Sequence, residues 1–259
     1  MRSANHEVLS FCADDAHGAP IMMKADELGI KPDDFIDQVK KSHEESLERF
    51  GISYTNYHST HSEENESLVS EIYLAAKSAG NIYKTDIEQC FDEEKQMFLA
   101  DRYVIGDCPK CGAVNQYGDG CDVCGATYSA TELVNPKSAL SGTTPNKKIS
   151  EHVFFDLEKE KENLANFLNN SSIQSTIVSK LSEWLDDDLR GWDISRDSPY
   201  FGFQIPGENE KYFYVWVDAP IGYMASAKNW ADRNLSLIHI SEPTRLLSIG
   251  GGGVGGEKK

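Results

Sequence analysis

Apolar positions along the first third of the chain alternate between strand-like runs and helix-like stripes. Residues 7–13 form a short apolar run that predicts a buried strand. Two helices are expected next, over residues 20–28 and 32–50, because each begins at a proline and carries apolar residues at helical spacing. A strand over residues 52–57 would complete a strand–helices–strand unit, which is typical of a parallel sheet.

The rest of the chain changes its pattern several times. Residues 62–80 predict a third helix, whereas residues 81–146 lose helical periodicity and indicate an insertion. A strand is expected over residues 152–155 and an amphipathic helix over 173–185. Residues 212–217 carry the strongest strand signal, which Asp218-Ala219-Pro220 ends, and Pro220 is placed to open a last helix.

Four cysteines within the insertion have the spacing of a metal site. Cys108 and Cys111 form one Cys-x-x-Cys-Gly turn, and Cys121 and Cys124 form a second. Four thiolates complete a tetrahedral zinc shell with no open position, so the predicted zinc ion is structural. The alternatives are two disulfides or a dithiol redox pair.

Composition narrows the class of protein. The 259 residues carry a formal net charge of −17, which argues against a surface that binds nucleic acid through bulk electrostatics. The sequence has no apolar stretch long enough for a membrane span and no signal-peptide core near its first residue. We therefore expect an intracellular, cytoplasmic protein.

Two segments are candidates for binding a small ligand. Asp15 follows the first expected strand, and residues 216–223 follow the last one, so both could meet at one sheet edge and bind a small amphiphilic ligand. By periodicity alone, the aromatic residues among them are more typical of a core than of a pocket. His58 and His61 lack the His-Glu-x-x-His order of a zinc hydrolase and are interpreted as strand-end and helix-cap residues.

Several strings together resemble one family. They are Cys-Ala-Asp-Asp-Ala-His-Gly at 12–18, Asn-Tyr-His-Ser-Thr-His-Ser-Glu-Glu-Asn at 56–65, the four-cysteine knuckle, Trp-Asp-Ile-Ser-Arg-Asp at 192–197, and residues 212–224. In combination they resemble the methionyl-tRNA synthetases of bacterial type over residues 1–234. The resemblance implies an α/β fold: a class I synthetase Rossmann domain interrupted by a zinc-binding connective-peptide insertion.

The resemblance also implies roles for individual residues. Asp15 would hold the amino group of methionine, and Arg196 would join it in the catalytic set. The methionine pocket would be lined by Trp216, Ala219, Pro220 and Tyr223. The implied reaction uses ATP with Mg²⁺ and transfers methionine to its tRNA in the cytoplasm. The resemblance also allows a homodimer of the intact enzyme.

The same resemblance divides the chain. Residues 1–80 and 196–234 would belong to the catalytic domain, and 81–195 to the insertion, with the knuckle at 108–124. Residues 235–259 resemble a translated sequencing adapter followed by glycines, so we expect a non-native tail; a flexible linker is the alternative.

The family's His-Ile-Gly-His-type and Lys-Met-Ser-Lys-Ser-type loops for ATP do not occur in this sequence. We therefore expect an internal fragment that is inactive alone. The functional alternatives are another class I aminoacyl-tRNA synthetase, or a non-enzymatic zinc-knuckle module that binds nucleic acid.

Overall fold

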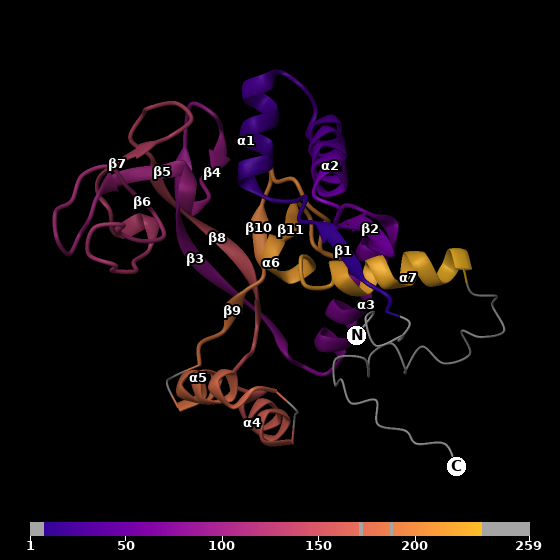
Figure 1. Ribbon diagram of the computed structural model, residues 1–259. Coiled ribbons are helices and arrows are strands. Elements are labelled where there is room, and N and C mark those ends of the chain that lie inside the picture. Colours follow the sequence, from indigo (N-terminus) through magenta and orange to yellow (C-terminus); the bar gives the residue numbers. More distant parts are fainter. Residues whose placement is uncertain (1–7, 171–172, 187–188, 235–259) are drawn as a thin grey trace, which may run out of the picture.

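A parallel pair of strands organises the first part of the chain. The computed structural model describes residues 8–170, 173–186 and 189–234 (Figure 1), so the expected tail at 235–259 lies outside the described residues. β1 (Phe11–Asp14) pairs in parallel with β2 (Asn56–Ser59), and α1 (Ala19–Leu28) and α2 (Pro32–Arg49) connect them. The predicted strand–helices–strand unit is confirmed.

β2 begins later than the sequence predicts. The amide of Ile52 donates to the carbonyl of Leu47 at 2.9 Å, so this residue closes the end of α2 instead of starting the strand. Ile52 is also 48% exposed, which shows that its apolar side chain does not mark a buried strand position.

Two helices cover the strand pair. α3 (Glu63–Ser78) follows β2, and three glutamates in its first turn suit the positive end of the helix dipole. α7 (Gly222–Asn234) packs against β1, β2 and α3, and Figure 1 shows it running alongside the strand pair. The helices predicted from Ser62 and after Pro220 are confirmed.

A four-stranded antiparallel sheet forms the middle of the molecule. Its order is β4 (Met97–Phe98), β3 (Ile82–Asp92), β8 (Asn146–Phe155) and β9 (Trp192–Asp193). β3 and β8 are much longer than the single strand predicted at 152–155. The sequence did not predict their full length because polar residues occupy most of their exposed positions and weaken the apolar signal. α4 (Lys161–Asn170) and α5 (Ser175–Asp186) follow β8, and α5 confirms the helix predicted at 173–185.

The cysteine-bearing segment folds around a small third sheet. Its order is β6 (Gln116–Tyr117), β5 (Val104–Asp107) and β7 (Val134–Ser138), with 3₁₀ turns at Asp101–Tyr103 and Ala130–Glu132. Figure 1 shows this sheet and the α4–α5 pair at opposite ends of the long β3–β8 ladder. None of the described helices is long and apolar enough to cross a membrane.

The strand predicted over residues 212–217 is wrong beyond Phe213. β11 (Lys211–Phe213) pairs with β10 (Ser195–Asp197), and α6 (Val215–Asp218) follows immediately. The ladder ends because Phe213 pairs with Ser195, the first residue of β10, so no partner strand continues past it. The amides of Val217 and Ala219 then bond to carbonyls within the new helical turn.

One hydrophobic cluster connects these parts. It joins side chains of α3, the four-stranded sheet, β11 and the segment before α7: Val69, Tyr73, Val153, Ile194, Phe203, Ile205, Phe213 and Ile221. This shared core fixes the α6–α7 corner relative to α3 and the four-stranded sheet.

Candidate functional site

Thr60 fixes the chain at the carboxyl edge of the parallel strand pair. Its amide donates to the carbonyl of Asp14 at 2.9 Å, and its hydroxyl accepts from the amide of Ala16 at 2.9 Å. Thr60 is buried. These bonds turn the segment after β1 across the edge at which open α/β sheets bind ligands.

The first residue of α7 must be small because the helix begins directly against this edge. A Cβ atom on Gly222 would lie 2.7 Å from Cγ2 of Thr60 and 3.7 Å from Cβ of Ala13. The first of these distances is too short for any real carbon–carbon contact. Glycine therefore allows the α6–α7 corner to reach the ends of β1 and β2.

A buried polar network joins the two segments. His17 Nδ1 is hydrogen-bonded to Asp218 Oδ2, and both side chains are fully buried although they are 201 positions apart in the sequence. His17 Nε2 lies 2.9 Å from His61 Nδ1, and Asn65 Nδ2 donates to the carbonyl of Thr60 at 2.8 Å. Burial raises the pKa of Asp218, and His17 opposes this shift. The sequence analysis missed Asp218 and treated it only as the end of a strand.

Asp15 stands beside this network with an exposed side chain. Desolvation and the neighbouring Asp218 raise the pKa of Asp15, whereas His17 lowers it. Within the described part of the chain, Asp15 forms no ion pair. Its place directly after β1, at the carboxyl end of the strand, is as predicted.

Trp216 and Pro220 line an apolar hollow of about 280 Å³ between α3, the four-stranded sheet and the α6–α7 corner. Tyr73 and Phe213 form part of its wall, and the side chain of Trp216 is 68% exposed at its rim. The structure thus brings together two of the four residues expected around methionine.

Ala219 and Tyr223 do not line this hollow, and neither does Asp15. Tyr223 is 65% exposed. Asp15 lies instead directly after β1, close enough to Asp218 and His17 for their charges to shift its pKa.

Arg196 also lies apart from the hollow. Its Cζ atom is 3.9 Å from the ring centroid of Tyr214, and its Nη1 donates to the carbonyl of Ser195 at 2.6 Å. Nη1 is 3.5 Å from Oδ2 of Asp193. The guanidinium group therefore packs on an aromatic ring instead of pointing toward Asp15.

The four cysteines converge as their spacing predicts. Their Sγ atoms all lie within 4.8 Å of one another. Cys108 and Cys124 are 3.8 Å apart at sulfur, and Cys111 and Cys121 are 3.6 Å apart, so these pairs are not disulfides. Zn–S bonds of about 2.3 Å place tetrahedral sulfurs about 3.8 Å apart, and the four thiols fit one zinc ion.

Both cysteine turns have the same backbone geometry. Gly112 and Gly125 adopt φ values of 74° and 70°, and their amides donate to the carbonyls of Cys108 and Cys121 at 2.9 Å. The backbone amides of residues 110 and 111 point at the sulfur of Cys108 and, against the effect of burial, lower the pKa of this thiol to about 6. These amides favour the thiolate at Cys108, which is the form that binds metal. Against the effect of a backbone amide, the neighbouring thiols raise the pKa of Cys111 to about 12.

The histidines near α3 do not form a metal site. His58 Nε2 lies 3.2 Å from Glu64 Oε2, and His61 contacts His17 and Asp33. Among the described residues, the four cysteines are the one group of three or more potential ligands close enough to share an ion. The interpretation of His58 and His61 as strand-end and helix-cap residues is consistent with this geometry.

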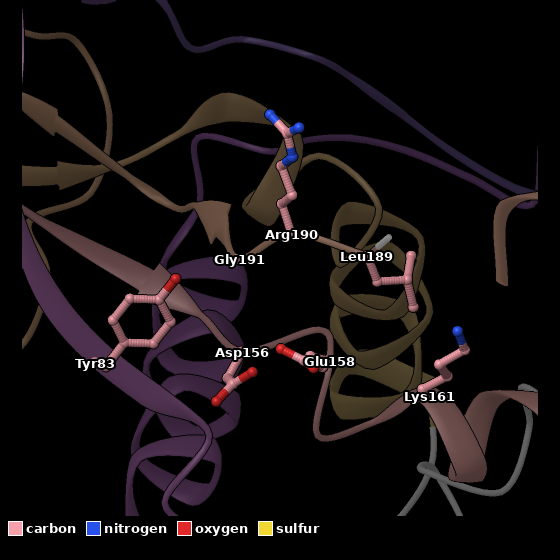
Figure 2. A pocket seen from close by; sticks show the side chains of 7 residues that line it. All are labelled: Tyr83, Asp156, Glu158, Lys161, Leu189, Arg190 and Gly191. Atoms are coloured by element: carbon pink, nitrogen blue, oxygen red, sulfur yellow. The ribbon is translucent and has the colours of Figure 1, made fainter. Parts of the chain in front are cut away.

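A larger hollow lies elsewhere and has mixed charge. It has a volume of about 690 Å³ near the end of β8 and is lined by Tyr83, Asp156, Glu158, Lys161, Leu189, Arg190 and Gly191. Figure 2 shows the Arg190 side chain pointing away from the two carboxylates. Asp156 already pairs with Lys159 at 3.1 Å. Because no single charge dominates, we do not assign a ligand to this hollow.

The fold and the site together define a class of protein. The chain combines a parallel strand pair, polar residues at its carboxyl edge, and a later inserted segment that holds four converging cysteines. This is the α/β arrangement of a class I aminoacyl-tRNA synthetase. The family model for class I tRNA synthetases (M) matches residues 1–238, and the chain belongs to this family.

Solved structures of Mycobacterium tuberculosis methionyl-tRNA synthetase are similar to this chain. Two, both with methionyl-adenylate, give TM-scores of 0.63 and 0.61 at 18% identity, covering 93% of this chain. A third, in the apo form, gives 0.50 at 18% identity over 81%. The chain spans 43% of the length of the first two and 38% of the third. At this identity the likeness supports the fold alone.

Proposed function

We propose that this chain carries the methionine-selecting part of a methionine–tRNA ligase. The observation that carries the proposal is the α6–α7 corner: Trp216 and Pro220 line an apolar hollow there, while Asp218 ties the same corner to the strand edge that bears Asp15. An apolar hollow linked through Asp218 to a strand edge with an unpaired carboxylate suits an amino acid with an apolar side chain and a cationic amino group.

Each residue has a distinct role in this proposal. Asp15 accepts hydrogen bonds from the ammonium group of methionine, whose positive charge opposes the rise in the Asp15 pKa caused by desolvation and Asp218. Trp216, Ala219, Pro220 and Tyr223 contact the side chain, where aromatic rings interact well with a polarizable thioether. Bringing Ala219 and Tyr223 into contact requires that methionine lie across the exposed face of the corner.

The proposed chemistry has two steps. A carboxylate oxygen of methionine attacks the α-phosphorus of ATP and pyrophosphate leaves. A ribose hydroxyl at the 3′ end of the tRNA then attacks the methionyl carbonyl, and AMP leaves. Mg²⁺ would neutralise phosphate charge, whereas this chain's contribution is to orient methionine, which is the entropic part of catalysis.

The four cysteines would hold one structural Zn²⁺ ion. The four sulfurs leave no open coordination position, so the ion would order the β5–β6–β7 sheet and take no part in the reaction. We further propose the division of the chain at residues 80 and 195, a cytoplasmic location, and an intact enzyme able to form a homodimer.

Binding of methionine tests the central proposal. Equilibrium dialysis of zinc-loaded chain with labelled methionine should show saturable binding that unlabelled leucine does not displace. Asp15→Asn should abolish it, because the amide cannot neutralise the ammonium group, whereas Asp26→Asn on the exposed side of α1 is the matched control. Binding of RNA without binding of methionine would favour the zinc-knuckle nucleic-acid module instead.

We also propose that the chain alone is inactive as a ligase. Neither ATP-loop motif occurs in its sequence, and it spans 43% of the length of two structural relatives. Methionine-dependent exchange of pyrophosphate into ATP by the purified chain would contradict this proposal without affecting methionine binding.

A further inference from the structure

His152 on β8 is a buried histidine that the methionine site does not use. Its side chain is 1% exposed, with Nδ1 2.8 Å from Asp193 Oδ2 and Nε2 2.9 Å from Asp197 Oδ2. Burial disfavours its protonated form, but the hydrogen bonds to the two carboxylates outweigh burial and raise the pKa of His152. A buried ionisable group with two carboxylate partners needs an explanation beyond core packing.

Asp193 connects His152 to Arg196. Its Oδ2 contacts His152 and lies 3.5 Å from Arg196 Nη1. Its Oδ1 accepts from both the amide and the hydroxyl of buried Ser195, at 3.1 and 3.2 Å. Both carboxylate oxygens are therefore engaged, and the oxygen that faces Arg196 is held from behind by His152.

Arg196 continues this connection toward Trp216. Its guanidinium carbon lies 3.9 Å from the centroid of the Tyr214 ring. The Tyr214 and Trp216 rings are parallel within 4°, with centroids 6.5 Å apart. Trp216 is 68% exposed, and this stack is one of the contacts that orient its ring.

The second carboxylate has its own set of partners. Asp197 Oδ1 pairs with Lys211 and accepts from the Ser150 hydroxyl at 2.9 Å, and Asp197 Oδ2 accepts from Gln89 at 2.8 Å. Asp197 therefore keeps several donors when His152 is replaced, whereas Asp193 loses the group that holds its Oδ2. The two sides of the imidazole ring can be tested separately.

We propose that His152 is a positioning residue for Trp216, acting through Asp193, Arg196 and Tyr214. Arg196 is then also a positioning residue, since its guanidinium reaches the pocket only through the Tyr214 ring. The inference rests on the proposed function only in giving Trp216 its role in binding methionine.

A pair of variants separates the two sides of the ring. An asparagine side chain places an N–H donor near the position of Nδ1, and a glutamine side chain places one near Nε2. His152→Asn therefore retains the donor to Asp193, and His152→Gln retains the donor to Asp197. A role in folding alone would be disturbed by both.

Fluorescence of Trp216 reports the outcome. The measurements use a chain in which Trp184, Trp192 and Trp230 are replaced by Phe, so that Trp216 is the only source of tryptophan fluorescence. In this background we expect H152Q to raise the iodide-quenching constant of Trp216 and to lower its anisotropy. Arg196→Met should change both quantities by the same factors. H152N and Ser150→Ala, which leave the Asp193 side intact, should match the parent. Far-UV circular dichroism and zinc content verify the fold of each variant.

Three results would overturn the inference: equal changes in H152N and H152Q, no change in R196M, or a change in S150A as large as in H152Q. If H152Q does not fold, R196M and Arg196→Lys decide, because lysine retains the charge but stacks poorly. Methionine binding is measured separately. A chain that fails to bind methionine but shows the expected fluorescence pattern would refute the proposed function and leave the positioning role intact.

Discussion

Removing the Asp218 carboxylate should destabilise the chain more than an exposed carboxylate substitution. Both Asp218 and His17 have side chains with no exposed surface, and the pair connects β1 to α6. In Asp218→Ala the imidazole of His17 loses its partner at Nδ1 in a site that water does not reach. Breaking a buried pair in this way costs about 3–5 kcal/mol.

The size of the effect depends on what replaces the carboxylate. Asp218→Asn keeps an oxygen that can accept from His17 but removes the charge, so the expected loss is about 1–3 kcal/mol. The Oδ1 atom of Asp218 is buried without a hydrogen-bond partner, and the amide group of asparagine gains nothing there. Glu27→Gln is the control, because Glu27 pairs with Lys24 on an exposed helix face and such pairs contribute about 0–1 kcal/mol.

Urea denaturation of zinc-saturated chain measures the three variants. The expected order of the loss in free energy of unfolding is D218A, then D218N, then E27Q. Since domains have total stabilities of about 5–15 kcal/mol, a loss of about 3–5 kcal/mol leaves D218A folded without denaturant unless the parent lies at the lower end of that range, where D218A would be close to its midpoint. A loss below about 1 kcal/mol in D218A would refute the argument that this pair holds the two segments together.

Three further changes test other parts of the structure. Gly222→Ala should lower the melting temperature, because its Cβ would lie 2.7 Å from Thr60 Cγ2; Gly142→Ala, with open space but φ of 76°, is the comparison for backbone strain alone. Metal analysis should find one zinc ion per chain, and Cys121→Ser or a chelator should remove it together with hydrogen-exchange protection in β5. His152 has a raised pKa, so its contribution to stability is complete below the pKa of the unfolded chain and is lost as the pH rises through the folded value. Urea midpoints measured against pH should show this loss in the parent and not in H152N.

The sequence predicts those features that depend on local spacing. Two Cys-x-x-Cys-Gly strings suffice to predict the cysteine turns. A proline followed by an apolar stripe suffices to predict each of the helices α1 and α2. Asp15 could be placed at a strand end for the same reason. In each of these cases the determining contacts lie within a few residues.

Features that depend on distant partners were not predictable in the same way. Residues 214–217 have strong strand propensity, yet β10 offers no partner beyond Ser195 and the chain turns into α6. The pairing of His17 with Asp218 and of His152 with Asp193 likewise depends on the arrangement of three sheets. A polar residue within a strongly apolar or aromatic segment, such as Asp218, was the available signal.

The fold brings together the strings that carry the family resemblance, although they lie far apart in the sequence. The segments at 12–18 and 212–224 meet through the hydrogen bond between His17 and Asp218. The string at 192–197 contacts the second of these segments, because Arg196 packs on the ring of Tyr214. β8, which falls within the proposed insertion, contributes His152 to this second contact. On the positioning role proposed for His152, the insertion would support the candidate methionine pocket as well as hold the four cysteines. H152Q, a substitution in β8 that leaves the zinc site intact, should then alter the surroundings of Trp216, which a change in a separate metal-binding module could not do.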